Sequence, residues 1–118
     1  MIGIDIIEIS RIEHAAANEK FIPKHFTQNE INYFKLKNMA PNTVAGNWAA
    51  KEAFSKALGT GIRGFSLTDI EILRNKHGAP YIKFKGKKIR AHLSISHSKE
   101  NAVAIVNLPW YSQIYKHI

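Results

Sequence analysis

The segment from Thr43 to Leu58 constrains the fold more than any other part of this sequence. Its composition predicts a helix, and alanine and larger apolar residues recur on nearly every side of that helix. Gly59 and Gly61 follow, and glycine commonly ends helices because it adopts positive φ without a steric penalty. A helix that is apolar almost all round must be covered by the rest of the chain, so we expect it to be buried.

One stripe of this helix carries Trp48, Glu52 and Lys56, which are spaced four residues apart. On an exposed helix, a Glu–Lys pair at this spacing would be an ordinary surface pair worth about 0.3 kcal/mol. A half-buried carboxylate, in contrast, needs a cation or another polar partner. Glu52 is therefore a candidate functional residue, with the structural pair as the alternative.

The first third of the chain predicts one strand and two short helices. Residues 1–7 are rich in isoleucine, which is typical of a strand. Ser10 is followed three residues later by a glutamate, so a capping box predicts a helix that begins there and ends before Pro23. Thr27 repeats this spacing and predicts the start of a second helix.

The second half of the chain predicts strands. Apolar and polar residues alternate in three short segments, and a fourth segment is an apolar run: 69–73, 81–85, 92–96 and 102–108. Their close spacing favours antiparallel hairpins. We therefore predict a single α+β domain over residues 1–108, an antiparallel sheet with helices packed on one face. Residues 109–118 form a tail to which we assign no role.

The amino-acid composition of the chain is ordinary for a globular protein. The chain has 118 residues, of which 45% are hydrophobic, and it has no cysteine, so disulfides and thiolate zinc sites are excluded. No apolar run approaches the roughly 20 residues that span a membrane. The first residues lack the basic start of a secretory signal.

The net charge is +8, from 17 basic and 9 acidic residues. Residues 74–98 contain no acidic residue, but they contain seven basic ones. Such a surface attracts nucleic acid, anionic lipid, phosphate-rich small molecules or acidic proteins, although a solvated basic face is the simpler explanation.

Two further residues are candidates for chemistry. Asp5 interrupts the isoleucines of the first strand, where aspartate is disfavoured. It either caps the strand end or provides an oxygen ligand, and Mg²⁺ is typically held by one or two carboxylates together with substrate phosphates. Asp5 and Glu52 would supply two carboxylates if the strand packs on the helix. His97 continues an apolar row at a strand end, where a structural histidine is the alternative.

Three motifs together resemble the short bacterial 4'-phosphopantetheinyl transferases, the holo-acyl-carrier-protein synthases. The likeness covers about residues 1–107. It rests on Gly3-Ile4-Asp5-Ile6 with Arg11, on the helix and glycine stop from Trp48 to Gly61, and on Ser94-Ile95-Ser96-His97-Ser98. The family usually carries arginine where this chain has Asn47, so a phosphate contact is either missing or supplied by a nearby lysine.

The resemblance implies a reaction and a set of site residues. The substrates would be coenzyme A and an apo acyl carrier protein, in support of fatty acid biosynthesis in the cytoplasm. Asp5 and Glu52 would hold Mg²⁺, and Lys56 would neutralise phosphate charge. His97 would either contact a phosphate or assist proton removal. The basic segment that contains Lys83 and Lys85 would bind the coenzyme.

The resemblance also implies protein partners. Arg11, Lys20 and Lys24 would dock the acidic carrier, and the chain would form homotrimers with active sites between subunits. No nucleic acid or membrane is expected. Two alternatives stay open on the residues alone: a Mg²⁺-dependent nuclease or nucleic-acid-binding protein that uses Asp5 and Glu52, and a basic docking module without enzymatic activity.

Overall fold

The computed structural model describes residues 1–59 and 64–109. Gly61 and residues 110–118 of the predicted tail lie outside this part of the chain. In chain order the elements are β1 (Ile2–Glu8), α1 (Ile9–Ala16), α2 (Phe21–His25), α3 (Gln28–Leu36), α4 (Pro41–Leu58), a 3₁₀ turn (Leu67–Asp69), β2 (Ile70–Arg74), β3 (Pro80–Phe84), β4 (Lys87–Lys88), β5 (His92–His97) and β6 (Asn101–Asn107).

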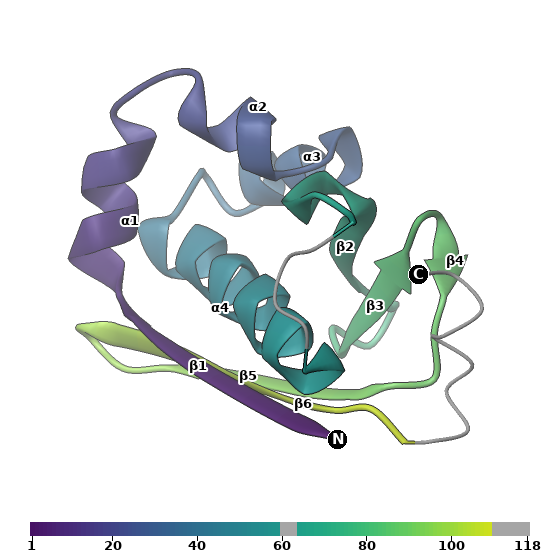
Figure 1. The fold of residues 1–118 in the computed structure, drawn as a ribbon. Helices are drawn as coiled ribbons and strands as arrows, with labels where there is room; N and C mark the ends of the chain where they lie inside the picture. Colours follow the sequence, from purple (N-terminus) through teal and green to yellow (C-terminus); the bar gives the residue numbers. More distant parts are fainter. Residues whose placement is uncertain (60–63, 110–118) are drawn as a thin grey trace.

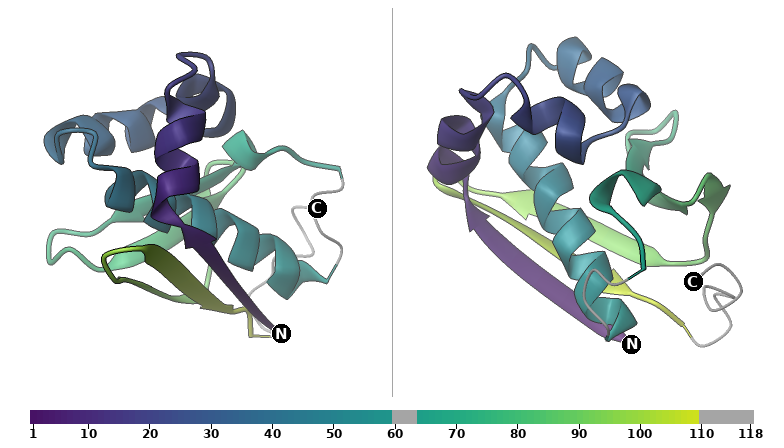
Figure 2. Two further views of the ribbon diagram at one scale, coloured as in Figure 1. Left: turned by 90° about the vertical axis from the view of Figure 1, so that its left-hand side faces the viewer. Right: turned by 45° about the horizontal axis from the view of Figure 1, so that its top comes forward.

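The predicted α+β class with antiparallel strands is confirmed, but the strands divide between two sheets. One sheet has the order β1-β6-β5 and the other β2-β3-β4, and every pairing is antiparallel. Figures 1 and 2 show α4 lying along one face of the first sheet, with α1, α2 and α3 on the same side. Among residues 1–59 and 64–109, no helix packs on the opposite face of this sheet (Figures 1 and 2).

Helix α4 is the buried central helix that its composition predicts. Its alanines at positions 45, 49, 50, 53 and 57 are buried, and it ends at Gly59, which has a φ of 77°. The small side chains let β1 approach closely. A Cβ atom added to Gly3 would lie 1.9 Å from the Ala53 carbonyl oxygen, so only glycine fits there. This close approach places β1 and its Asp5 against the helix that carries Glu52.

The short helices confirm one predicted boundary and correct another. Thr27 caps α3 through the predicted box, because its hydroxyl accepts from the Glu30 amide at 3.3 Å and Glu30 Oε1 accepts from the Thr27 amide at 3.1 Å. The prediction for Ser10 was wrong. Helix α1 begins at Ile9, has Glu8 as its N-cap without a side-chain bond, and ends at Ala16.

Pro23 also differs from its predicted role as a helix stop. It lies in the first turn of α2, where the backbone nitrogen needs no partner within the helix, so a proline is tolerated. Among the described residues, no helix combines the length and the apolar character needed to cross a membrane.

Candidate active site

Asp5 and Lys56 meet where β1 crosses α4. Odd-numbered residues of β1 face the helix, which turns the Asp5 side chain toward it. Lys56 Nζ lies 2.9 Å from Asp5 Oδ1 and also donates to the Ile4 carbonyl oxygen at 3.1 Å. The Asp5 side chain is 17% exposed and that of Lys56 is 55% exposed. The ion pair found for Lys56 among the described residues is thus with Asp5, and not with Glu52 four residues earlier.

Glu52 completes a pair of neighbouring carboxylates. Burial raises the pKa of Glu52, the charge of Asp5 raises it further, and Lys56 opposes both effects. Asp5 and Glu52 line one cleft together with Trp48 and Arg11. One lysine thus faces two carboxylates, so one negative charge is not neutralised and a cation could bind beside it. Two carboxylates combined with substrate phosphate oxygens are a donor set that suits Mg²⁺. No group of three or more potential metal ligands occurs among the described residues.

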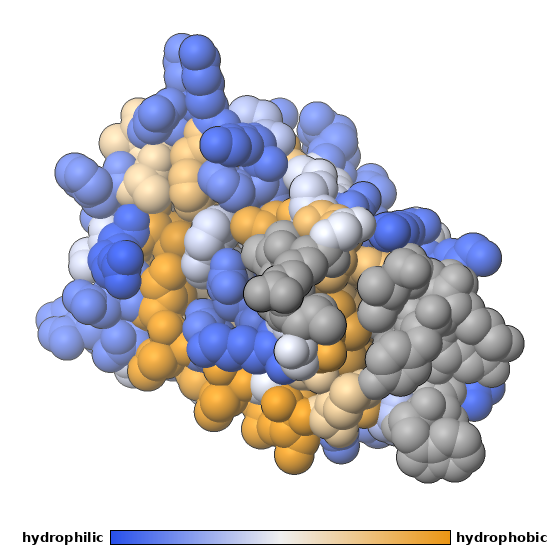
Figure 3. Space-filling model, viewed as in Figure 1, coloured by the Kyte–Doolittle hydropathy of each residue, from blue (hydrophilic) through white to orange (hydrophobic). Residues whose placement is uncertain are grey.

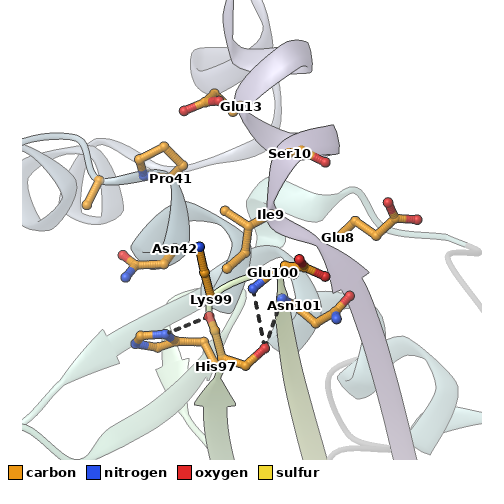
Figure 4. A pocket seen from close by; sticks show the side chains of 12 residues that line it. Glu8, Ile9, Ser10, Glu13, Pro41, Asn42, His97, Lys99, Glu100 and Asn101 are labelled. Carbon is orange, nitrogen blue, oxygen red and sulfur yellow. Dashed lines mark hydrogen bonds between the residues drawn. The ribbon is translucent and has the colours of Figure 1, made fainter.

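His97 lies apart from this cleft. It ends β5 and lines a larger cavity between α1, the start of α4 and the β5–β6 turn, with a volume of about 1110 Å³. Figure 4 shows its ring beside Asn42 and the turn, and Nδ1 contacts the Ser98 carbonyl oxygen at 3.4 Å. A single chain therefore does not bring His97 into the cleft of Asp5 and Glu52.

The remaining predicted binding residues are distributed over the surface. Lys83 lies on β3, and Lys85 follows in the turn to β4, with its Nζ 5.5 Å from the centre of the Phe84 ring. Neither residue lines the Asp5–Glu52 cleft. Lys20 and Lys24 are exposed at α2. Arg11 is exposed as well, but it lines the carboxylate cleft, so it lies closer to the candidate chemistry than a pure docking residue would.

A buried polar network beside the site was not predicted. Lys51 Nζ lies 2.6 Å from Glu30 Oε1, and both side chains are fully buried. Asn47 is also buried and connects Glu30 to Arg74. Burial lowers the pKa of Lys51 and raises that of Glu30. The one signal in the sequence is a lysine at position 51 among the alanines of a helix that has to be buried.

The family to which the chain belongs is shown by its sequence over nearly its whole length. The family model of the 4'-phosphopantetheinyl transferase superfamily matches residues 1–106. The chain belongs to this superfamily, which confirms the resemblance seen in the sequence and the enzyme class that it implied.

Proteins named holo-[acyl-carrier-protein] synthase are similar over most of the chain. The one from Clostridium beijerinckii is 57% identical over 112 residues, which is 87% of this chain and 91% of that protein. The structure of the Helicobacter pylori enzyme in complex with coenzyme A has a TM-score of 0.81 and 37% identity, and the match covers 92% of this chain and 100% of that one. A Bacillus anthracis structure with a TM-score of 0.76 is 47% identical, with 89% and 91% covered.

Proposed function

We propose that this chain transfers 4'-phosphopantetheine from coenzyme A to a serine of apo acyl carrier protein. The serine oxygen attacks the β-phosphorus of the coenzyme diphosphate, and the bond from this phosphorus to the bridging oxygen breaks. Adenosine 3',5'-bisphosphate leaves with that oxygen, and the serine proton passes to a base. The observation that carries the proposal is the cleft lined by Asp5 and Glu52, with Lys56 paired to Asp5, in a chain 57% identical to a holo-[acyl-carrier-protein] synthase.

The residues of the cleft suit phosphoryl transfer, which chiefly requires charge neutralisation and alignment. Asp5 and Glu52 would hold Mg²⁺, which when bound neutralises charge on the diphosphate. The Lys56 side chain is 55% exposed beside Asp5, so its ammonium could donate to a phosphate oxygen of the leaving group. Its bonds to Asp5 and Ile4 fix its position before substrate arrives. Residues 1–108 form the transferase domain.

We also propose that the active enzyme is a homotrimer. The outer face of the β1-β6-β5 sheet presents exposed isoleucines, Ile4 at 57% and Ile105 at 44%, which are direct partners in the β1–β6 register. Figure 3 shows hydrophobic side chains along the lower edge of the molecule, beneath β1. An apolar face of this kind is typical of a protein interface. Association would bring His97 and the basic segment with Lys83 and Lys85 to the Asp5–Glu52 cleft of a neighbouring subunit.

The carrier would dock beside this cleft. Arg11, Lys20 and Lys24 present positive charge at α1 and α2, near the cleft residues Phe21 and Trp48. Rim charges of this kind steer and orient an acidic partner more than they tighten its binding. We place the reaction in the cytoplasm, in the supply of carrier for fatty acid biosynthesis.

The test is to incubate the protein with coenzyme A, Mg²⁺ and an apo carrier and to weigh the carrier. The expected gain is about 340 Da, the mass of one phosphopantetheine arm on a serine hydroxyl. Asp5→Ala should abolish the gain and leave the protein folded, because it removes a ligand and not core volume. Lys76→Met is a matched control that removes an exposed charge elsewhere. An unmodified carrier with the wild-type protein would refute the proposal, and cleavage of nucleic acid by the same sample would favour a nuclease.

A further inference from the structure

Arg74, at the end of β2, has a guanidinium group that is only partly provided with partners. Its Nη2 donates to Asn47 Oδ1 at 3.0 Å, and the group lies 4.9 Å from the centre of the Tyr33 ring. Its Nη1 has no hydrogen-bond partner among the described residues, although it is shielded from solvent. Buried donors are nearly always paired, so an unpaired charged donor indicates that an acceptor is missing.

Buried groups fix the orientation of this guanidinium. Asn47 is fully buried, and its Nδ2 donates to Glu30 Oε2 and to the Ile72 carbonyl oxygen, both at 3.0 Å. With both amide hydrogens engaged, only Oδ1 is left to face Arg74. Glu30 is held in turn by Lys51. Burial also lowers the pKa of Arg74, because its surroundings solvate the positive charge poorly, and Tyr33 and Glu30 oppose this effect only in part. A bound anion would compensate for this loss of solvation.

The guanidinium lines a small cavity with the chemistry of an anion site. The cavity has a volume of about 210 Å³ and lies between α3, the first turns of α4, β2 and β5. Its other lining groups include Tyr33, Thr43 and His97, and none of the lining residues is acidic. Thr43 lies in the first turn of an 18-residue helix, where the backbone dipole favours negative charge. A guanidinium, an imidazole and a helix N-terminus thus converge on one small space.

We propose that Arg74 binds a phosphate group of the coenzyme in this cavity and that Asn47 is the positioning residue that aims it. This inference rests on the proposed function, because coenzyme A is the substrate that would bring the phosphate. A planar guanidinium with a free N–H suits a phosphate oxygen, which accepts charge-assisted hydrogen bonds. The phosphate would be either the 3'-phosphomonoester or part of the diphosphate, and the two are chemically alike at this site.

The test is to measure binding of coenzyme A and of dephospho-coenzyme A, which lacks the 3'-phosphate, by calorimetry. Arg74→Leu should weaken coenzyme A binding by about 10- to 100-fold, the usual effect of losing a hydrogen bond to a charged group. The control Lys76→Met, which removes an exposed charge from the same hairpin, should bind within about twofold of wild type. If the cavity takes the 3'-phosphate, Arg74→Leu weakens the binding of coenzyme A and leaves the binding of dephospho-coenzyme A unchanged. If it takes the diphosphate, both compounds lose the same factor.

Arg74→Gln serves as a second variant, because it keeps a side-chain N–H donor on this strand and removes the charge, and circular dichroism checks that it folds. In transfer assays both variants should raise the KM for coenzyme A and leave the KM for the carrier unchanged, which a merely structural defect would not do. Asn47→Ser should raise the KM for coenzyme A when it is introduced into the wild-type protein. When it is introduced into the Arg74→Leu variant, it should raise this KM no further.

Coenzyme A binding by Arg74→Gln within twofold of the Lys76→Met control would overturn the inference. That outcome leaves the proposed function intact as long as the wild-type protein modifies the carrier. A wild-type protein that fails to modify the carrier would instead refute the proposed function itself.

Discussion

The position of Glu52 reduces the stability of the folded protein at neutral pH. It lies beside a second carboxylate and is partly buried, and both conditions raise its pKa. A carboxyl group whose pKa is higher in the folded state stabilises the fold below its ordinary value of 4.5. This contribution is lost as the pH rises through the raised value. At neutral pH the charged form therefore destabilises the metal-free protein.

We expect Glu52→Gln to abolish transfer and, without metal, to leave the protein at pH 7 slightly more stable than wild type. The gain should be on the order of 0.5 kcal/mol, because solvent screens a group that is only half-buried. It should disappear below pH 4.5, where wild-type Glu52 is itself protonated. Urea unfolding in the presence of a chelator at the two pH values measures the difference. A variant that is less stable than wild type at pH 7 would show that the Glu52 carboxylate makes a structural bond.

At the scale of helices and strands, local sequence patterns predict a boundary correctly where the interacting residues are close in sequence. They fail where the interacting residues are distant in sequence. Thr27 begins α3 as predicted because its capping partner is three residues away. The same spacing at Ser10 fails, because the strand-to-helix junction is fixed by the Ile9 amide, which donates to the Glu100 carbonyl oxygen at 2.8 Å. The division into two sheets is equally non-local.

The candidate site shows the same contrast. Asp5 and Glu52 were identified by residue type, since each carboxylate is out of place in an apolar element. The contact of Arg74 with Asn47 joins residues 27 positions apart in the sequence. The local pattern of apolar and polar residues does not predict such a contact. Likewise, the buried pair of Lys51 and Glu30 depends on how α3 packs on α4, and local patterns of residue type do not specify that packing.

The close packing of β1 on α4 can be tested at Gly3. We expect Gly3→Ala to destabilise the protein by about 3 kcal/mol, as overpacking against an unyielding neighbour does. The added Cβ would overlap backbone atoms of Ala53 and Ala57. Gly46→Ala is the matched control, because its Cβ would meet only the Ile95 side chain at 3.0 Å and alanine favours the helix. Denaturant unfolding measures both, and an equal effect of the two substitutions would contradict the close packing of β1 as the cause.

At the scale of the whole molecule, one chain holds the parts of a transferase site in separate places. The cleft with Asp5 and Glu52 lies at the junction of β1, α1 and α4. The large cavity lined by His97 lies between α1, the start of α4 and the β5–β6 turn, and the cavity lined by Arg74 lies between α3, α4, β2 and β5. The β1–β6–β5 order separates Asp5 from the β5 strand by the full width of β6. An arrangement of several copies around the apolar sheet face would unite these parts, so assembly and activity should be lost together.

Ile105→Asp tests this link, because it places a charge in the centre of the exposed sheet face, opposite Ile4. A charge buried in an interface without a partner is strongly unfavourable, so we expect monomers and a loss of transfer of at least about 100-fold. Leu36→Asp is the matched control: Leu36 is 80% exposed on α3, away from the sheet, and its replacement should change neither property. Light scattering gives the mass of each variant, circular dichroism confirms the fold, and the carrier mass shift reports transfer. Monomers of Ile105→Asp that modify the carrier at the wild-type rate would show that a single chain contains a complete site.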